Sequence, residues 1–538
     1  IKLNFQYFDF IECKTTYNNV YKHKQIFEPL NPKNPIFKKQ SKEKNTPPIL
    51  SKYYQGKMDF WQFFTGLGII ILKQGGYLCY IAPNSWLTSF GASEMRSQIL
   101  TNTKIEKYID FKDNKIFKSA DIQTMIMLLK KATTQTHKIK HTAIPNAEGK
   151  NFAEKSININ KELQNATFNT IEIQSQTTMD NINDSIYFVS NTAKPLFDKI
   201  EKVGTYKLRE IHVANGIVFP SDVVNAKSQK ILGKDFKVGD GIFSITTAEK
   251  DALNLTKKEL ELIKPEYTTE QIDRYFANNK NTRWVIYTDS SFKKHDKIKE
   301  YPKIKKHLDK FIEVIISDNR PYGIHRARGE GFFTGEKIIS LRKCTNRPRF
   351  SYVDFDSYVS AAFYVIKPTD INLKYLTGLL NSKLIAFYLK NKGKMQGSNY
   401  QIDKDPLCKI PIAIANANQQ ANIITKVELM LDTNNKINKI NETMFKLLVG
   451  DFASININKK IEKWSGLSWG EFLSEITKQK FDINGKLKED WLKRFEEKQT
   501  EIKTLQSTLT QTDTEIDKMV YALYNLTEEE IKVVEGLE

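Results

Sequence analysis

The sequence DFWQFFTGLGIIIL-KQGG-YLCYIA-PN occupies residues 59–84 and carries the clearest structural signal of the chain. Residues 59–72 place apolar side chains at helical spacing, and Gly75-Gly76 supplies the left-handed backbone with which many helices end. Residues 77–82 are a continuous apolar run closed by Pro83, which is typical of a buried strand. The segment therefore predicts a helix followed by a strand, the repeating unit of an α/β domain.

The same alternation continues on both sides of this segment. A short apolar strand is expected at residues 8–11, a helix through residues 95–100, and further strands at residues 105–111 and 124–129. Strands that alternate with helices predict parallel βαβ units. We therefore assign residues 1–135 to part of an α/β domain.

Three further regions follow along the chain. Residues 136–200 are rich in Thr, Asn and Gln and are interpreted as a linker with small β additions. Residues 201–412 combine short strands and turns with two helices, expected near residues 291–317 and 372–391, which makes this region α+β. Residues 413–538 are predicted to be an α-helical tail.

Two apolar stripes in the tail favour an antiparallel helix pair, although two helices packed separately on the body of the protein fit the pattern equally well. The stripes consist of Ile423, Val427, Met430, Ile437, Met444 and Leu448, and of Phe495, Ile502, Leu509, Ile516 and Leu523.

The composition describes a folded, basic protein of several domains. The chain has 538 residues, of which 40% are hydrophobic, so wholesale disorder is excluded. Its 82 Lys and Arg residues exceed its 63 Asp and Glu residues and give a net charge of +19, which predicts an anionic partner. Nucleic acid is the first candidate, an acidic membrane surface is the second, and an ordinary basic enzyme is the third.

Cysteine and histidine usage narrows the class of protein. The four cysteines lie far apart without a CxxC pair, which argues against structural zinc and a disulfide scaffold and fits a reducing cytoplasm. Only one pair of the seven histidines, His137 and His141, is four residues apart, and two ligands alone do not make a metal site, so none is expected. No apolar run approaches the roughly 20 residues of a membrane span. We therefore predict a cytoplasmic protein without metal or membrane partner.

The basic run between Arg320 and Arg349 is the candidate DNA-binding surface. Guanidinium groups suit bidentate contact with guanine edges and with phosphates, and the run also contains aromatic side chains. A solvated basic loop is the alternative interpretation. The residues predicted to contact DNA are Arg320, Tyr322, Arg326, Arg328, Lys337, Arg342 and Lys343.

Several short motifs, taken in their order, resemble a known family. Residues 53–96, which contain Gly75-Gly76 and Pro83-Asn84-Ser85-Trp86, resemble the part of Taq-type adenine-N6 DNA methyltransferases that follows the catalytic loop. Nearly the whole chain, with a poor match at residues 132–200, resembles the large methyltransferase subunits of type IIG restriction–modification systems. The motifs that carry the resemblance are Gly75-Gly76, Pro83-Asn84-Ser85-Trp86, Asp273-Arg274-Tyr275, Asn319-Arg320-Pro321-Tyr322, Leu379-Leu380-Asn381-Ser382-Lys383 and Asp513-Thr514-Glu515-Ile516-Asp517.

The resemblance implies both a fold and a function. The fold is a partial Rossmann-like methyltransferase domain (residues 1–135), an α+β target-recognition domain (residues 201–412) and a helical tail (residues 413–538). The function is N6-methylation of adenine in double-stranded DNA, with S-adenosylmethionine as the methyl donor. Because the reacting amino group lies inside the duplex, the family flips the target base out of the helix.

The residues at the expected catalytic loop depart from the family pattern. The family places an Asn, Asp or Ser, two prolines and an aromatic residue after a strand, where the polar side chain accepts hydrogen bonds from the adenine amino group. After the strand at residues 8–11 this chain has Lys14, Thr15, Thr16 and Tyr17. Tyr17 keeps the stacking ring, but the ammonium of Lys14 has no acceptor lone pair. The resemblance therefore implies an altered catalytic loop.

The S-adenosylmethionine-binding loop and the nuclease of such systems lie upstream of the catalytic loop. We therefore expect a missing N-terminal region, or a separate chain, to carry the cofactor site. Two hypotheses remain: an active methyltransferase subunit completed by that region, or a catalytically inactive, decayed or split DNA-recognition module. A third interpretation treats Glu12 and Lys14 as half of a nuclease motif, for which only Asp9 is near as a second carboxylate, on the opposite face of the strand.

Overall fold

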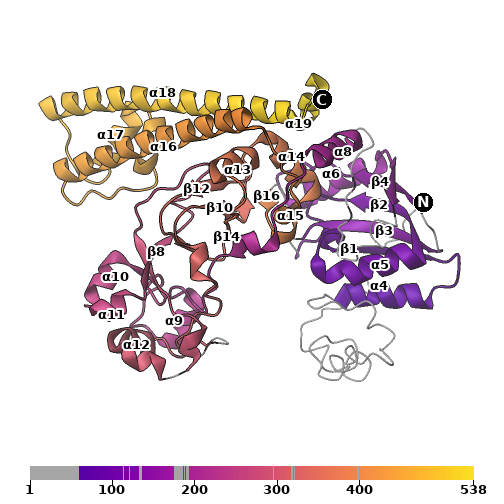
Figure 1. Ribbon diagram of the computed structural model, residues 1–538, viewed down its shortest axis with the longest axis horizontal. Coiled ribbons are helices and arrows are strands. Elements are labelled where there is room, and N and C mark those ends of the chain that lie inside the picture. Colours follow the sequence, from indigo (N-terminus) through magenta and orange to yellow (C-terminus); the bar gives the residue numbers. More distant parts are fainter. Residues whose placement is uncertain are drawn as a thin grey trace. The chain divides into compact units, whose positions relative to one another are not determined.

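The computed structural model describes residues 60–537, apart from residues 113, 120–121, 133–135, 175–185, 187, 189–192, 295, 317–318, 320 and 397–398. The chain divides into two compact units. The first comprises Ile1–Pro195 with Gln396–Ser398, and the second comprises Leu196–Met395 with Asn399–Glu538. Figure 1 labels the elements of both units.

The first unit is built on one five-stranded sheet with the order β1-β3-β2-β4-β5. β3 runs antiparallel to β1 and to β2, β4 is parallel to β2, and β5 is antiparallel to β4. β1 and β2 therefore run in the same direction, with β3 between them and helix α5 connecting them. The strands are β1 (Tyr77–Pro83), β2 (Thr103–Asp110), β3 (Thr124–Lys131), β4 (Thr136–Ala143) and β5 (Asn169–Gln174).

Helices cover both faces of this sheet. α4 (Phe60–Ile71) and α5 (Ser93–Asn102) pack on one face, around a core that includes Ile69, Trp86 and Met95. α6 (Phe152–Gln164) covers the other face, where Ile159 packs with Ile109. The turn between α4 and β1 uses Gly75 at a φ of +79°, which is the left-handed conformation that the sequence predicts there.

Three predictions for this unit need correction. The parallel βαβ arrangement is only partly present, because β3 lies antiparallel between β1 and β2. β1 is an edge of the described sheet, so Tyr77 and Cys79 are exposed rather than buried. Residues 136–174, predicted as linker with small β additions, instead supply β4, β5 and α6 to the same sheet and its covering layer.

The second unit contains three small sheets. Their orders are β12-β10-β14-β6, β13-β8-β9-β7 and β11-β16-β15. The first sheet is antiparallel throughout, whereas β13 is parallel to β8. The strands are β6 (Val213–Asn215), β7 (Ser244–Thr246), β8 (Ile263–Tyr267), β9 (Arg283–Ile286), β10 (Lys337–Leu341), β11 (Lys343–Cys344), β12 (Phe350–Val353), β13 (Tyr358–Val359), β14 (Phe363–Ile366), β15 (Lys394–Gln396) and β16 (Asn399–Gln401).

Short helices surround these sheets. The helix predicted near residues 291–317 is confined to α12, and the one predicted near residues 372–391 is divided into α13 and α14, because Ser382 caps a new helix. The helices are α8 (Lys194–Val203), α9 (Ala226–Leu232), α10 (Thr247–Ala252), α11 (Lys257–Leu260), α12 (Pro302–Asp309), α13 (Leu373–Leu380), α14 (Lys383–Lys392) and α15 (Lys404–Lys409).

The C-terminal region is helical and is dominated by α16 (Ala417–Asp451) and α18 (Gly485–Leu523), shown in Figure 1 as two long helices lying along each other. The two helices are antiparallel: Lys426 pairs with Glu515 at 2.6 Å, and Trp491 Nε1 donates to Asp451 at 3.0 Å toward the other end. α17 (Trp469–Thr477) packs on the pair through an aromatic cluster, and α19 (Glu528–Glu535) follows α18.

Candidate nucleic-acid interface

The predicted catalytic residues Lys14, Thr15, Thr16 and Tyr17 lie outside the described residues, as does Arg320. The other six predicted DNA-contacting residues are described, and they do not form one outward-facing surface. They are distributed between the turns that follow α12 and the sheet strands β10 and β11. Their contacts decide which of them is available to a partner.

Tyr322 and Lys337 are buried, and we correct the prediction for both. The Tyr322 hydroxyl donates to Asp309 at 2.6 Å, on the last turn of α12. Lys337 is 0% exposed, and its Nζ donates to the carbonyls of Gly335 at 2.7 Å and Phe355 at 2.6 Å. Burial lowers the pKa of the Lys337 ammonium to about 7, because a charged amine is costly away from water. Neither side chain reaches the surface.

Arg342 and Arg328 contribute to internal contacts. Arg342 Nη2 donates to Asp403 at 3.0 Å, and its guanidinium lies 5.1 Å from the centre of the Tyr364 ring. Arg328 adopts a φ of +73° and its Nε donates to the carbonyl of Gly216 at 3.3 Å. These contacts fix the guanidinium groups against neighbouring segments of the same unit.

Arg326 and Lys343 are the exposed members of the predicted set among the described residues. The backbone of Arg326 forms an antiparallel bridge with Val218, and its Nη1 donates to the carbonyl of His325 at 2.9 Å. Lys343 lies on the short strand β11, opposite Gln401 of β16. Contact of these two residues with DNA remains a prediction.

A partly buried ion cluster connects α18 to the rest of the second unit. Asp513 of α18 accepts hydrogen bonds from Arg274 Nη2 at 2.6 Å, from Arg347 Nη1 at 2.9 Å and from the Tyr275 hydroxyl at 3.1 Å. One helical turn later, Asp517 accepts the backbone N–H of Lys383 at 2.7 Å and contacts Arg347 at 3.5 Å. We call Arg274, Tyr275, Arg347, Asp513 and Asp517 the ion cluster.

The ion cluster joins three sequence motifs that lie far apart in the chain. Arg347 also donates to the carbonyl of Asn381, which follows α13, so the cluster fixes the sheet region, the α13–α14 junction and α18 to one another. Burial raises the pKa of Asp517 to about 6, and Arg347 partly offsets this effect. The sequence identifies these motifs but does not predict that they contact one another. The only signal for this contact is that all three motifs belong to the same family pattern.

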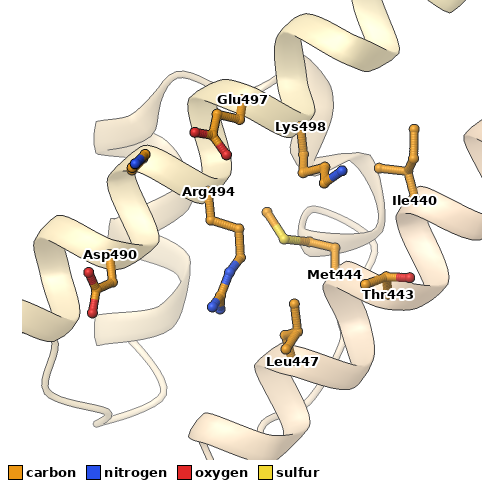
Figure 2. A pocket seen from close by; sticks show the side chains of 9 residues that line it. Ile440, Thr443, Met444, Leu447, Asp490, Arg494, Glu497 and Lys498 are labelled. Carbon is orange, nitrogen blue, oxygen red and sulfur yellow. The ribbon is translucent and has the colours of Figure 1, made fainter.

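The shallow cavity of about 330 Å³ between α16 and α18 is a different kind of feature (Figure 2). Its floor includes Met444 and Leu447, and its wall carries side chains of both signs, including Arg494 and Glu497. Arg494 lies over the Trp491 ring at 4.9 Å. The mixed charges give the cavity no preference for an anionic ligand.

The described βα connection of the first unit does not fit S-adenosylmethionine. A methyl-donor site of this kind needs a glycine-rich turn whose backbone can approach the ligand. The turn after β1 is instead filled by buried Trp86 and Leu87, and Arg96 Nη1 donates to the carbonyl of Trp86 at 2.6 Å. We therefore derive no reaction step from this connection.

Metal and membrane sites are absent from the described part of the chain. Among the described residues, no group of three or more His, Cys, Asp or Glu side chains is arranged to hold a metal ion. None of their helices combines the length and the apolar character needed to cross a membrane.

Comparison with protein families identifies two of these regions. Residues 34–117 match the Eco57I restriction-modification methylase family, and residues 264–412 match the TaqI-like C-terminal specificity domain. Residues 416–520, which contain α16 and most of α18, match DUF8810, a domain of unknown function. The predicted resemblance to restriction–modification methyltransferases with a Taq-type specificity region is confirmed.

Individual relatives agree with this assignment. The chain is 22% identical over 388 residues to the type II methyltransferase M.HincII of Haemophilus influenzae, covering 69% of this chain and 70% of the relative. It is 25% identical over 272 residues to the type II restriction enzyme and methyltransferase RM.Eco57I of Escherichia coli, covering 49% of this chain. The match spans 25% of RM.Eco57I.

Solved structures of restriction–modification enzymes resemble the chain distantly. The type IIL enzyme MmeI, solved in complex with DNA, matches 89% of this chain with 13% identity and a TM-score of 0.48. The type IIG endonuclease BpuSI matches 90% of this chain with 10% identity and a TM-score of 0.28. The chain spans about half of each of these two proteins, 51% in both cases.

Proposed function

Given a chain related to the methyltransferases of restriction–modification systems, we propose that it is the DNA-recognition portion of an adenine-N6 DNA methyltransferase that binds a specific duplex sequence. The observation that carries this proposal is the match of residues 264–412 to a specificity domain. In this proposal residues 1–135 belong to a Rossmann-like methyltransferase domain, residues 201–412 are the target-recognition domain, and residues 413–538 are its helical tail.

The ion cluster supports a recognition role for the second unit. Base-specific contacts require side chains that are held in fixed positions on a preorganised scaffold. Arg274 and Arg347 both donate hydrogen bonds to Asp513 of α18 and thereby join the specificity region to this helix. A region that is fixed in this way can present the loops around it in one geometry.

The catalytic half of the proposal depends on a region that supplies the methyl donor. S-adenosylmethionine is the donor that the methyltransferase relatives imply. Two features of the first unit support an additional covering region: β1 is an edge strand of the described sheet, and α4 exposes an apolar stripe made of Phe64, Leu67 and Ile71. Apolar edges of this kind are normally covered in a complete α/β sheet.

Selection from a random duplex library tests the recognition proposal. The purified chain is incubated with duplexes that carry a randomised central segment, and retained duplexes are sequenced after several rounds. We expect enrichment of one short sequence that contains an adenine. A retained pool without any enriched sequence, with binding to all duplexes alike, would contradict sequence-specific recognition.

A catalytically inactive recognition module is the second candidate function. Lys14 favours it, because an ammonium cannot accept a hydrogen bond from the adenine amino group. Transfer of a tritiated methyl group from S-adenosylmethionine to the enriched duplex separates the two candidates. Incorporation supports the active subunit, whereas selective duplex binding without incorporation, alone and with cell extract from the source strain, supports the inactive module.

A further inference from the structure

A lobe of the second unit combines exposed aliphatic side chains with lysines that form no ion pair with any described residue. We define the lysine lobe as residues 226–240, which contain α9, and residues 302–316, which contain α12; Figure 1 labels both helices in the same part of the unit. The Phe236 and Phe311 rings lie 5.3 Å apart, and the His307 Nε2 lies 2.9 Å from the carbonyl of Ile242. These contacts hold the two segments of the lobe together.

The lobe contains eight lysines and four carboxylates. Lys303 and Lys305 have partners, the carbonyl of Asn254 and the carboxylate of Asp309. Two of the four carboxylates are also engaged, since Asp309 binds Lys305 and the Tyr322 hydroxyl, and Asp240 accepts the backbone N–H of Lys237. The lysines that are exposed and form no ion pair within the described part of the chain are Lys227, Lys230, Lys234, Lys237, Lys306 and Lys310.

The packing of the lobe brings lysines from separate segments to the same region. Lys237 directly follows Phe236, and Lys310 directly precedes Phe311, so the contact between the two rings brings together the two segments that carry these lysines. Lys227 and Lys230 are three residues apart on α9, which puts them on one helical face. Gln229 Nε2 also donates to the carbonyl of Phe236 at 2.8 Å and ties the loop to α9.

Exposed aliphatic side chains lie beside these lysines. Ile231 is 51% exposed next to Lys230, and Val238 is 60% exposed next to Lys237. Ile312 and Ile316 are exposed after α12. A purely solvated charged face does not need such side chains, whereas a nucleic-acid contact uses both kinds: lysines neutralise phosphates, and aliphatic groups contact sugars and thymine methyl groups.

From this arrangement we infer that the lysine lobe is a surface that grips the phosphate backbone of duplex DNA. The inference rests on the proposed function and adds to it where the backbone is held. It also moves the phosphate contacts away from the basic run at residues 321–349, where Lys337 and Arg342 are engaged internally. Because lysine contacts phosphate as a point charge, the lobe positions the duplex without reading its sequence.

A matched pair of variants tests this inference on the full chain. The first variant changes the six unpaired lysines of the lobe to Gln. The control changes six lysines of α16 and α18 that are likewise exposed and form no ion pair in the described part of the chain: Lys439, Lys446, Lys486, Lys488, Lys493 and Lys518. Both variants therefore lose the same formal charge, and circular dichroism confirms that each remains folded.

The measurement is duplex affinity as a function of salt concentration. Each phosphate contact contributes about 0.9 to the slope of log affinity against log salt. We expect the lobe variant to lose about 3 to 5 from this slope, and more than roughly tenfold in affinity at low salt, equally for duplexes of different sequence. We expect the control to keep the wild-type slope.

Three results would overturn the inference: equal losses in the two variants, an unchanged slope in the lobe variant, or a loss confined to one duplex sequence. Binding of the wild-type chain to phosphatidylserine vesicles, lost in the lobe variant while duplex binding is retained, would instead assign the lobe to an acidic membrane surface. If the wild-type chain binds no duplex at all, the proposed function itself fails, and the two failures are thereby distinguished.

Discussion

Two basic regions of the second unit differ in what their side chains contact. In the basic run at residues 321–349, Lys337 donates to backbone carbonyls, Arg342 pairs with Asp403, and Arg347 pairs with Asp513. In the lysine lobe, six lysines face solvent without an ion-pair partner among the described residues. Both regions are basic in sequence: residues 321–349 contain seven Lys and Arg and two Glu, and the lysine lobe contains eight Lys and four Asp and Glu. What separates them is whether the fold brings an acceptor to each cation.

Positive charge in a sequence motif therefore does not by itself locate a binding surface. A guanidinium that is paired with a carboxylate of its own chain, as in Arg342 with Asp403 and Arg347 with Asp513, is less available for phosphate. An exposed ammonium without a partner retains its attraction for anions. The four predictions below test this separation, beginning with the substitution that should have the largest effect.

Arg347→Ala should cost the most stability. It leaves Asp513 with Arg274 and Tyr275 as partners, and it removes the donor to the Asn381 carbonyl. Hydrogen bonds to charged groups typically contribute about 1.5–3 kcal/mol each. Because the Arg347 and Asp513 side chains are 23% and 15% exposed and Asp513 keeps two partners, we expect a loss of about 3 kcal/mol in the free energy of unfolding, measured by chemical denaturation. Arg349→Ala is the matched control, because its 3.6 Å contact with Asp273 is more exposed and should contribute less than about 1 kcal/mol. Equal losses would remove the distinction between the two arginines.

Asp517→Asn should change how stability depends on pH. The pKa of Asp517 is about 6 in the folded protein, above the 3.8 of an unperturbed Asp, so the folded state binds more protons between these values. Protonated Asp517 therefore contributes roughly 3 kcal/mol to the free energy of unfolding below about pH 4, and this contribution is lost as the pH rises through 6. Arg347, Lys383 and Asp513 face this group. The free energy of unfolding, measured by denaturation at several pH values between 4 and 7, should depend less on pH in the variant than in the wild type. An equal pH dependence would contradict the raised pKa of Asp517.

Lys337→Met should lower the free energy of unfolding without changing DNA affinity. The substitution leaves the carbonyls of Gly335 and Phe355 without their donor, and an unpaired buried carbonyl costs about 1–3 kcal/mol. Lys343→Met, at the exposed position of strand β11, should leave stability unchanged. Thermal denaturation and duplex titration check both variants. A weaker duplex affinity of folded Lys337→Met would return this residue to the binding surface.

Arg326→Ala should have the smallest effect. Arg326 is the exposed arginine of the predicted set within the described residues, and its loss should weaken duplex binding by about threefold, with one unit less in the salt slope at most. Lys503→Ala on α18 should leave the affinity unchanged. A loss as large as that of the six-lysine variant would show that the basic run, and not the lysine lobe, dominates the contact.

The sequence predicted local structure well and long-range structure poorly. The helix at residues 60–71, the turn at Gly75 and the strand at residues 77–83 follow from spacing and backbone preference, which are encoded locally. The antiparallel insertion of β3 depends on which strands meet in space, which no short pattern contains. The same reason explains why β1 is an exposed edge although its residues are apolar.

The candidate interface shows the same limit. The composition of the basic run predicted DNA contact, but Arg347 in this run pairs with Asp513, 166 positions later in the sequence. Lys337 illustrates a second limit, because its two acceptors are backbone carbonyls and carry no sequence signature. The sequence alone made no prediction for the lysines of α9 and α12, because exposed lysines are common in any segment of a protein.

The long-range pairing of the ion cluster has a consequence for the order of events during synthesis. Asp513 follows Arg274 by 239 residues, so a ribosome releases the arginine long before its carboxylate exists. Until α18 emerges, the guanidinium groups of Arg274 and Arg347 in the nascent specificity region lack the carboxylate of Asp513, with which they pair in the folded protein. α18 can dock on the specificity region only after residues 509–538 have been synthesised, so a chain that ends at residue 508 should fold without the ion cluster and unfold at a lower denaturant concentration than the full chain.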